Sequence, residues 1–105
     1  MGGRGASSSK SIGINNEFTR IRTMLKEFDY INQREADEFM EGIRDEITYA
    51  KQDYEENGIT DKEQLQKRMK RRMRNYIGGR YMFQDGRHND EIMDIADKIA
   101  KKIYK

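Results

Sequence analysis

The fold is decided by residues 32–58, NQREADEFMEGIRDEITYAKQDYEENG. Apolar or small side chains recur in this stretch at alternating spacings of four and three residues, which places them on one stripe of a helix, roughly 80° wide. These positions are Ala36, Met40, Ile43, Ile47, Ala50 and Tyr54. Asn32 and Glu35 have the spacing of a capping box, and Asn57-Gly58 supplies a left-handed stop. We therefore predict a long helix that begins after Asn32 and ends before Gly58.

Two shorter amphipathic segments lie on either side of this helix in the chain. The first begins near Asn15 or Asn16, either of which can cap a helix with its side-chain oxygen. Its apolar face is made of Phe18, Ile21, Leu25 and Phe28. The other begins at a capping box of Thr60 and Glu63 and ends at Gly78-Gly79. Its apolar face is made of Leu65, Met69, Met73, Tyr76 and Ile77.

A further helix restarts at Asn89, after the pattern breaks between residues 80 and 88. Its inward positions are Ile92, Ile95, Ala96, Ile99, Ala100 and Ile103. Short links between these segments predict an all-α fold, a compact bundle of about four amphipathic helices. Residues 1–13 are rich in glycine and serine and have little to bury, so we expect a disordered tail there. Residues 14–105 then form a single helical domain.

The composition limits the chemistry available to this chain. It has no cysteine and one histidine, His88, which excludes disulfides, thiolate nucleophiles and cysteine-bound zinc or iron–sulfur sites. No carboxylate spacing matches a calcium loop, and no phosphate-loop, nucleophile-elbow or dinucleotide motif occurs. We therefore expect no catalytic residue, no cofactor and no metal, and we expect His88 to lie at the surface or to cap a helix.

The hydropathy of the chain predicts a protein of the cytoplasm. Hydrophobic residues make up 34% of the sequence and charged residues 38%. No apolar run approaches the roughly 18 residues of a membrane span, and the start of the chain lacks the apolar core of a secretory signal. We expect no contact with a membrane.

A net charge of +2 hides a strong separation of signs. Residues 27–57 hold eleven acidic and three basic side chains, whereas residues 64–80 hold seven basic side chains and no acidic one. An evenly mixed surface would not divide in this way. The two oppositely charged segments are expected to pair with each other, within one molecule or between copies, or to bind different partners.

The basic segment predicts a helix face that can follow a phosphate backbone, because guanidinium groups match phosphate geometry and each neutralised phosphate releases counterions. Arg72 is expected near the edge of the core. The candidate contacts are Lys67, Lys70, Arg71 and Arg74, opposite the apolar face, with Arg68 on one shoulder. The alternatives are pairing with the acidic helix and a merely solvated face.

The link over residues 80–88, RYMFQDGRH, interleaves cations and aromatic rings, as base-stacking loops do. We interpret Met82 and Phe83 as a plug for the end of the bundle and Arg80, Tyr81 and Arg87 as candidate contacts with a partner or nucleic acid.

The acidic helix supplies a second candidate surface. Glu38, Glu41 and Asp45 point away from its apolar stripe and can imitate nucleic-acid phosphates toward a basic protein. Tyr49 is expected on the polar side of the same helix, where an aromatic ring is a candidate anchor for an interface.

Residues 1–9, MGGRGASSS, resemble the opening of small proteins from phages and prophages of Gram-positive bacteria. Within that group, a small helical domain with segregated charge is similar to the anti-CRISPR proteins that inhibit Cas9. The resemblance implies a host nuclease ribonucleoprotein, with Cas9 and its guide RNA as the candidate, as the partner in the cytoplasm of an infected or lysogenic bacterium. That class shares no fold and no motif, so it assigns no site residue.

The function expected from these observations is that of a non-enzymatic, phage-type inhibitor, which binds a host defence nucleoprotein through a basic and an acidic helix. Cas9 holds its guide RNA in a positively charged channel, so a protein that carries both charge signs can contact the channel and the RNA. Two alternatives remain open. One is a direct DNA- or RNA-binding protein that uses the basic helix, and the other is a phage structural component that forms dimers or larger homo-oligomers.

Overall fold

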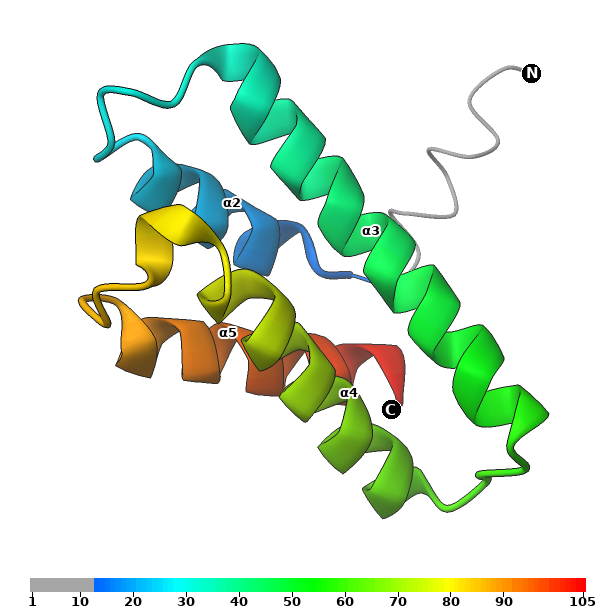
Figure 1. Cartoon of the computed structure of the whole chain (residues 1–105). Coiled ribbons are helices and arrows are strands. Elements are labelled where there is room, and N and C mark those ends of the chain that lie inside the picture. Colours follow the sequence, from blue (N-terminus) through cyan, green and yellow to red (C-terminus); the bar gives the residue numbers. More distant parts are fainter. Residues whose placement is uncertain (1–12) are drawn as a thin grey trace.

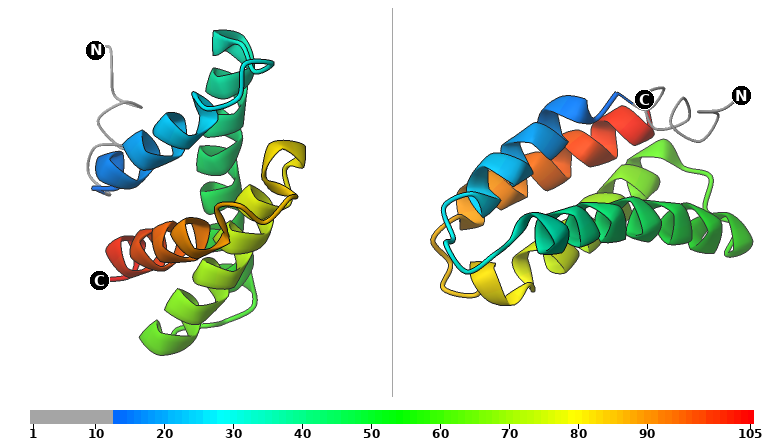
Figure 2. Two further views of the ribbon diagram at one scale, coloured as in Figure 1. Left: turned by 90° about the vertical axis from the view of Figure 1, so that its left-hand side faces the viewer. Right: turned by 90° about the horizontal axis from the view of Figure 1, so that it is seen from above.

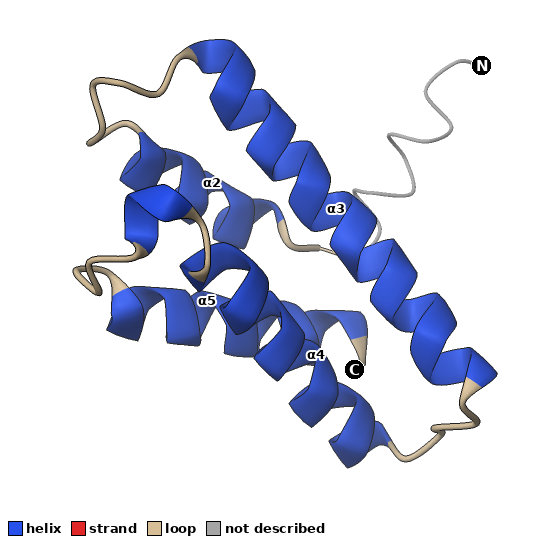
Figure 3. Ribbon diagram, in the orientation of Figure 1, coloured by secondary structure: helices blue, strands red, loops and turns tan. Residues whose placement is uncertain are grey.

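The computed structural model describes residues 13–105, and these form four α-helices and one short 3₁₀ turn (Figure 1). The elements are α2 (Asn15–Leu25), α3 (Gln33–Glu56), α4 (Lys62–Gly78), η1 (Tyr81–Phe83) and α5 (Asn89–Ile103). Figure 3 shows helices and loops in this part of the chain and no strand. The predicted all-helical class is therefore confirmed. The predicted tail lies outside the described residues except for Gly13, which forms a turn.

The helices close into a ring of four. Each packs against the next along the chain, and α2 packs against α5. Seen from above (Figure 2), α2 and α5 run side by side in opposite directions, and α3 and α4 form a hairpin beside them. The smallest dimension of the molecule is 20 Å, close to the thickness of two helices of about 10 Å each. No helix within residues 13–105 is both long and apolar enough to cross a bilayer.

One hydrophobic cluster joins all four helices. The stripe predicted for α3 is confirmed, since Met40, Ile43, Ile47, Ala50 and Tyr54 are buried and Ala36 packs against the cluster. The periodicity of the sequence missed Phe39, Ile14 and Met24, which are also buried. Phe39 lies beside the stripe because α3 contacts both α4 and the loop after it, so its buried surface is wider than a single seam.

The predicted asparagine cap of α2 is wrong. The cap position is Ile14, whose side chain is buried, and neither Asn15 nor Asn16 caps the helix. Gly13 has a φ of 70°, a conformation that turns the chain at little cost for glycine and lets Ile14 enter the core. Burying an isoleucine contributes about 2 kcal/mol, more than the roughly 1 kcal/mol of an N-cap. The core thus sets the start of this helix.

The α3 boundaries were predicted correctly, whereas the start of α4 is shifted by one residue. Asn32 and Glu35 form the expected capping box, and Gly58 has a φ of 72°. The cap of α4 is Asp61, whose carboxylate accepts a hydrogen bond from the backbone N–H of Gln64 at 2.9 Å, so the box of Thr60 and Glu63 does not form. Aspartate caps helices as well as threonine does.

The loop after α4 closes one end of the bundle, as predicted for Met82 and Phe83, which are both buried. His88 was expected at the surface or in an N-capping role, and the second is the position that the structure gives it. It stands at the cap position of α5 without a side-chain capping bond, and its ring packs edge-on against Phe28 and Phe83. Its Nε2 lies 2.9 Å from Glu27 Oε1. Phe28 and Phe83 hold the imidazole ring against the core, and the Glu27 carboxylate is the hydrogen-bond partner of its Nε2.

Candidate nucleic-acid interface

The outward face of α4 carries four exposed cations that we name the basic strip: Lys67, Arg68, Arg71 and Arg74. Met69 and Met73 of the same helix are fully buried, so the strip faces away from the core. Lys67 and Arg74 are separated by two helical turns, or roughly 10 Å along the axis. None of the four cations forms an ion pair with a carboxylate within residues 13–105. Their charge is therefore available to an external anion.

Two other cations of α4 are engaged inside the molecule and border the basic strip. Arg72 donates a hydrogen bond of 2.6 Å to Glu46 on α3, and this bond raises the pKa of the guanidinium. Lys70 lies 3.6 Å from Asp97 on α5 and is half-buried, so it stands at the edge of the predicted face instead of its centre. Among the described residues, the ion pairs between α3 and α4 are those of Arg72 with Glu46 and with Asp53.

The cations of α5 provide a comparison. Lys98 lies 2.8 Å from Asp94, Lys101 lies 3.1 Å from Asp97, and Lys102 lies 2.9 Å from Glu17. Each of these lysines thus has a carboxylate partner. Glu17 is almost fully buried, so its pair with Lys102 ties the start of α2 to the end of α5. Unlike these lysines of α5, the cations of the basic strip have no carboxylate partner within residues 13–105.

The predicted acidic residues lie together on the outer surface of α3. Glu38, Glu41 and Asp45 are exposed and form the acidic strip, and Tyr49 is 57% exposed beside them. Glu38 lies 3.6 Å from Arg34 one turn earlier. No ion pair of Glu41 or Asp45 occurs within the described residues.

The two strips belong to α3 and α4, which pack against each other. The pair of Arg72 and Glu46 marks the seam along which α4 meets α3. Arg68 lies one turn from Arg72 on α4, and Tyr49 lies one turn from Glu46 on α3, because residues three and four apart are neighbours on a helix surface. One cation of the basic strip and the exposed ring beside the acidic strip therefore flank this seam.

The loop residues predicted as contacts gather at the end of the bundle where α4 finishes. The Arg80 guanidinium lies over the rings of Phe39 and Tyr76, at 5.5 and 5.7 Å from their centroids. Arg87 lies over Phe28 and pairs with Asp85 at 2.8 Å. The hydrogen bond from the backbone N–H of Arg87 and, to a smaller extent, this ion pair lower the pKa of Asp85.

The structure adds one residue to this group that sequence reasoning missed. Tyr30, in the loop between α2 and α3, lies with its ring centroid 6.0 Å from that of Tyr81, and both rings are more than half exposed. The two residues are fifty-one positions apart in the chain, so no local pattern links them. The only signal available was that Tyr30 follows the apolar face of the first helix in a short loop.

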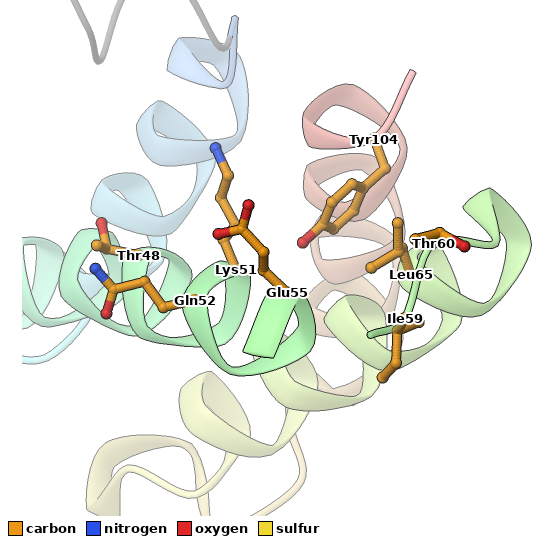
Figure 4. Close-up of a pocket in the computed structure, with 8 residues that line it drawn as sticks. All are labelled: Thr48, Lys51, Gln52, Glu55, Ile59, Thr60, Leu65 and Tyr104. Atoms are coloured by element: carbon orange, nitrogen blue, oxygen red, sulfur yellow. The ribbon is translucent and has the colours of Figure 1, made fainter. Parts of the chain in front are cut away.

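A hollow of about 570 Å³ lies on another part of the surface (Figure 4). Lys51 and Glu55 of α3 line one side, and Tyr104, Leu65 and Ile59 line the other. Burial raises the pKa of Tyr104. No group of three or more histidine, aspartate or glutamate side chains in the described part of the chain is placed to hold a metal ion.

Comparisons with protein-family models, with curated proteins and with solved structures found no match for this chain. The site is therefore interpreted from its own geometry.

Proposed function

We propose that this chain is a non-enzymatic binding protein for a nucleoprotein, in which the basic strip of α4 contacts phosphates and the acidic strip of α3 contacts the protein beside them. The observation that carries the proposal is that the four adjacent cations of the basic strip have no carboxylate partner within residues 13–105. A host nuclease ribonucleoprotein, with Cas9 and its guide RNA as the candidate, is the target that the resemblance of residues 1–9 implies.

The basic strip suits a phosphate backbone in charge and in length. Like charges held on adjacent turns repel one another, and a row of phosphates relieves that repulsion. A face of roughly 10 Å spans about three phosphates of one strand. Arginine adds bidentate hydrogen bonds to phosphate oxygens, which lysine cannot make in the same geometry.

The acidic strip restricts where nucleic acid can lie. Its carboxylates repel phosphates, so a strand bound to α4 cannot extend sideways across α3. A basic protein surface next to the nucleic acid would instead be attracted to α3. The two strips together fit a place where phosphates and protein cations lie side by side, and they oppose binding to either component in another orientation.

Direct binding to bare DNA or RNA is the second candidate function. It is favoured by the difference between the two strips, since Glu38 has an intramolecular partner in Arg34 whereas no member of the basic strip has one. In that case, the acidic strip contributes repulsion only and its neutralisation raises the affinity.

A pair of charge-matched variants tests the proposal. One replaces Lys67, Arg68, Arg71 and Arg74 with glutamine, which retains good helix formers at exposed positions. The control replaces Lys26, Lys51, Lys62 and Lys105, four exposed or half-exposed lysines outside the strip, and removes the same net charge. A third variant changes Glu38, Glu41 and Asp45 to Gln, Gln and Asn. Binding is measured on mixed-sequence duplex, single-stranded RNA, free Cas9, and Cas9 loaded with guide RNA.

The proposal predicts that the loaded complex binds tightest and that both strip variants weaken it, while the lysine control changes affinity by less than about threefold. The salt slope of the basic-strip variant should shrink by up to about one unit per lost phosphate contact. Equal loss in the control would show that only net charge matters. Tight binding to bare nucleic acid, improved by the acidic-strip variant, would support the second candidate. A change in oligomeric mass alone would point to pairing between copies.

A further inference from the structure

Two tyrosines from different loops form an exposed pair of rings at the end of the bundle, and we name this pair the tyrosine platform: Tyr30 and Tyr81. Their side chains are 60% and 54% exposed, and their planes are inclined by 33° at a centroid distance of 6.0 Å. Tyr49 and Met93 are the other exposed large hydrophobic side chains in the described residues. The platform is thus a surface of aromatic rings without an exposed branched aliphatic side chain.

The platform has a firm base. Tyr30 packs on Phe28 at 5.8 Å, and Phe28 packs edge-on against Phe83 at 5.7 Å. Phe28 and Phe83 both belong to the buried core. Tyr30 is thus supported by a buried ring and Tyr81 by Tyr30, and a supported ring loses less conformational freedom when a planar ligand stacks on it.

The charge around the platform favours an anionic ligand with flat rings. Arg80, next to Tyr81, is exposed and has no carboxylate partner within residues 13–105. Of the acidic groups in these loops, Glu27 is engaged with His88 and Asp85 with Arg87, whereas Asp29 is exposed next to Tyr30. The basic strip ends at Arg74, only six residues before Arg80 in the chain. The basic strip and Arg80 thus belong to neighbouring parts of the chain, with Arg80 nearer to the rings.

We propose that the tyrosine platform stacks unpaired bases of single-stranded nucleic acid whose phosphates lie on Arg80 and the basic strip. This inference rests on the proposed function, because the strip supplies the phosphate contacts. Every base has a π-face, so stacking on tyrosine tolerates any sequence. Bases within a duplex are already stacked on each other and present only their edges, so the platform distinguishes single strands from duplexes.

The test uses the full chain with single-stranded oligomers of 12 deoxythymidine or 12 uridine nucleotides, and with a mixed-sequence duplex of the same length. The variant Tyr30→Ala with Tyr81→Ala removes both rings, and Tyr30→Phe with Tyr81→Phe retains them. Met93→Ala removes an exposed apolar side chain of α5, outside the two strips and the platform, and serves as the control. The chain has no tryptophan and six tyrosines, so stacking can also be followed as quenching of tyrosine fluorescence.

We expect the double alanine variant to lose roughly tenfold in affinity for single strands per stacked base, and to bind the duplex within about twofold of the parent. The double phenylalanine variant should bind as the parent does but with less quenching. The proposal is overturned if the parent does not bind single strands, if the double alanine variant binds them as the parent does, or if Met93→Ala loses as much. Loss of binding to Cas9 loaded with guide RNA, with single-strand affinity intact, would make the platform a protein contact and also overturn it.

The failure of this inference can be told from failure of the proposed function. If only the basic-strip variant loses affinity, the phosphate contacts stand and the stacking fails. If only the platform variants lose affinity, the stacking stands and the assignment of the basic strip fails.

Discussion

The Arg72 guanidinium of α4 lies 2.6 Å from the Glu46 carboxylate of α3, in the seam between the basic and acidic strips. Both side chains are less than one-third exposed, so the pair is screened less than a surface ion pair. A double-mutant cycle with Arg72→Gln and Glu46→Gln should give a coupling of about 1–2 kcal/mol in the free energy of unfolding. A coupling within experimental error of zero in urea unfolding would show that the seam is held by packing alone.

Ile47 tests the buried stripe of α3. It is 4% exposed, and Ile47→Asp would place a carboxylate in the core at a cost of at least about 3 kcal/mol. A small domain has little stability to spare, so we expect the variant to lose its cooperative melting transition in circular dichroism. The adjacent Thr48→Asp, on the exposed side of the same helix, should melt like the parent. Parental melting of Ile47→Asp would mean that the face of α3 is wrongly assigned.

The effect of Gly42→Ala on stability is predicted to change sign when Tyr76 of α4 is replaced by phenylalanine. A Cβ at Gly42 would collide with the Tyr76 hydroxyl of α4. In the parent, Gly42→Ala should therefore destabilise the fold by about 1 kcal/mol, because the clash outweighs the gain in helix propensity. In a Tyr76→Phe background the same change should stabilise by about 0.5–1 kcal/mol. Thermal melts of the four proteins measure this, and stabilisation by Gly42→Ala in both backgrounds would contradict the close packing.

The contribution of Asp94 to the stability of the fold should depend on pH and be lost in acid. Hydrogen bonds from Lys98 and Arg20 lower its pKa below the ordinary value of 3.8. A carboxylate with a lowered pKa stabilises the fold above its unfolded pKa and loses that effect as the pH falls through the folded value. The difference in unfolding free energy between the parent and Asp94→Asn should thus be constant at neutral pH and shrink below about pH 4. Asp45→Asn, at an exposed position without an ion pair in the described residues, serves as the control, and an equal shrinkage there would contradict this role of Asp94.

The helices were predicted well because buried side chains recur at the helical period, and that period is visible in the spacing of apolar residues along the chain. Ile43 and Ile47 recur at the helical spacing of an inward stripe, and both are in the core. The helix starts were less certain because neighbouring residues compete for the cap. Asp61 replaces Thr60, and Ile14 takes the cap position ahead of Asn15.

The candidate site was predictable only where one helix supplies it. The basic strip follows from α4 alone, whereas its edges depend on Glu46 and Asp97, which belong to other helices. Tyr30 meets Tyr81 only because two loops close the same end of the bundle. Such contacts depend on how the four helices pack, so no local sequence pattern predicts them.

The buried pair of Glu17 and Lys102 sets an order of events during synthesis. The two residues are 85 positions apart, so the carboxylate of the first helix has no partner until the last helix has left the ribosome. Until then, α2 would have to bury an uncompensated charge in order to dock, which is strongly unfavourable. We therefore expect α4 to pack early against α3 and α5, its neighbours in the chain, and α2 to dock afterwards. The packing of α2 on α5, which closes the ring, would then be the final step, made once Lys102 can reach Glu17.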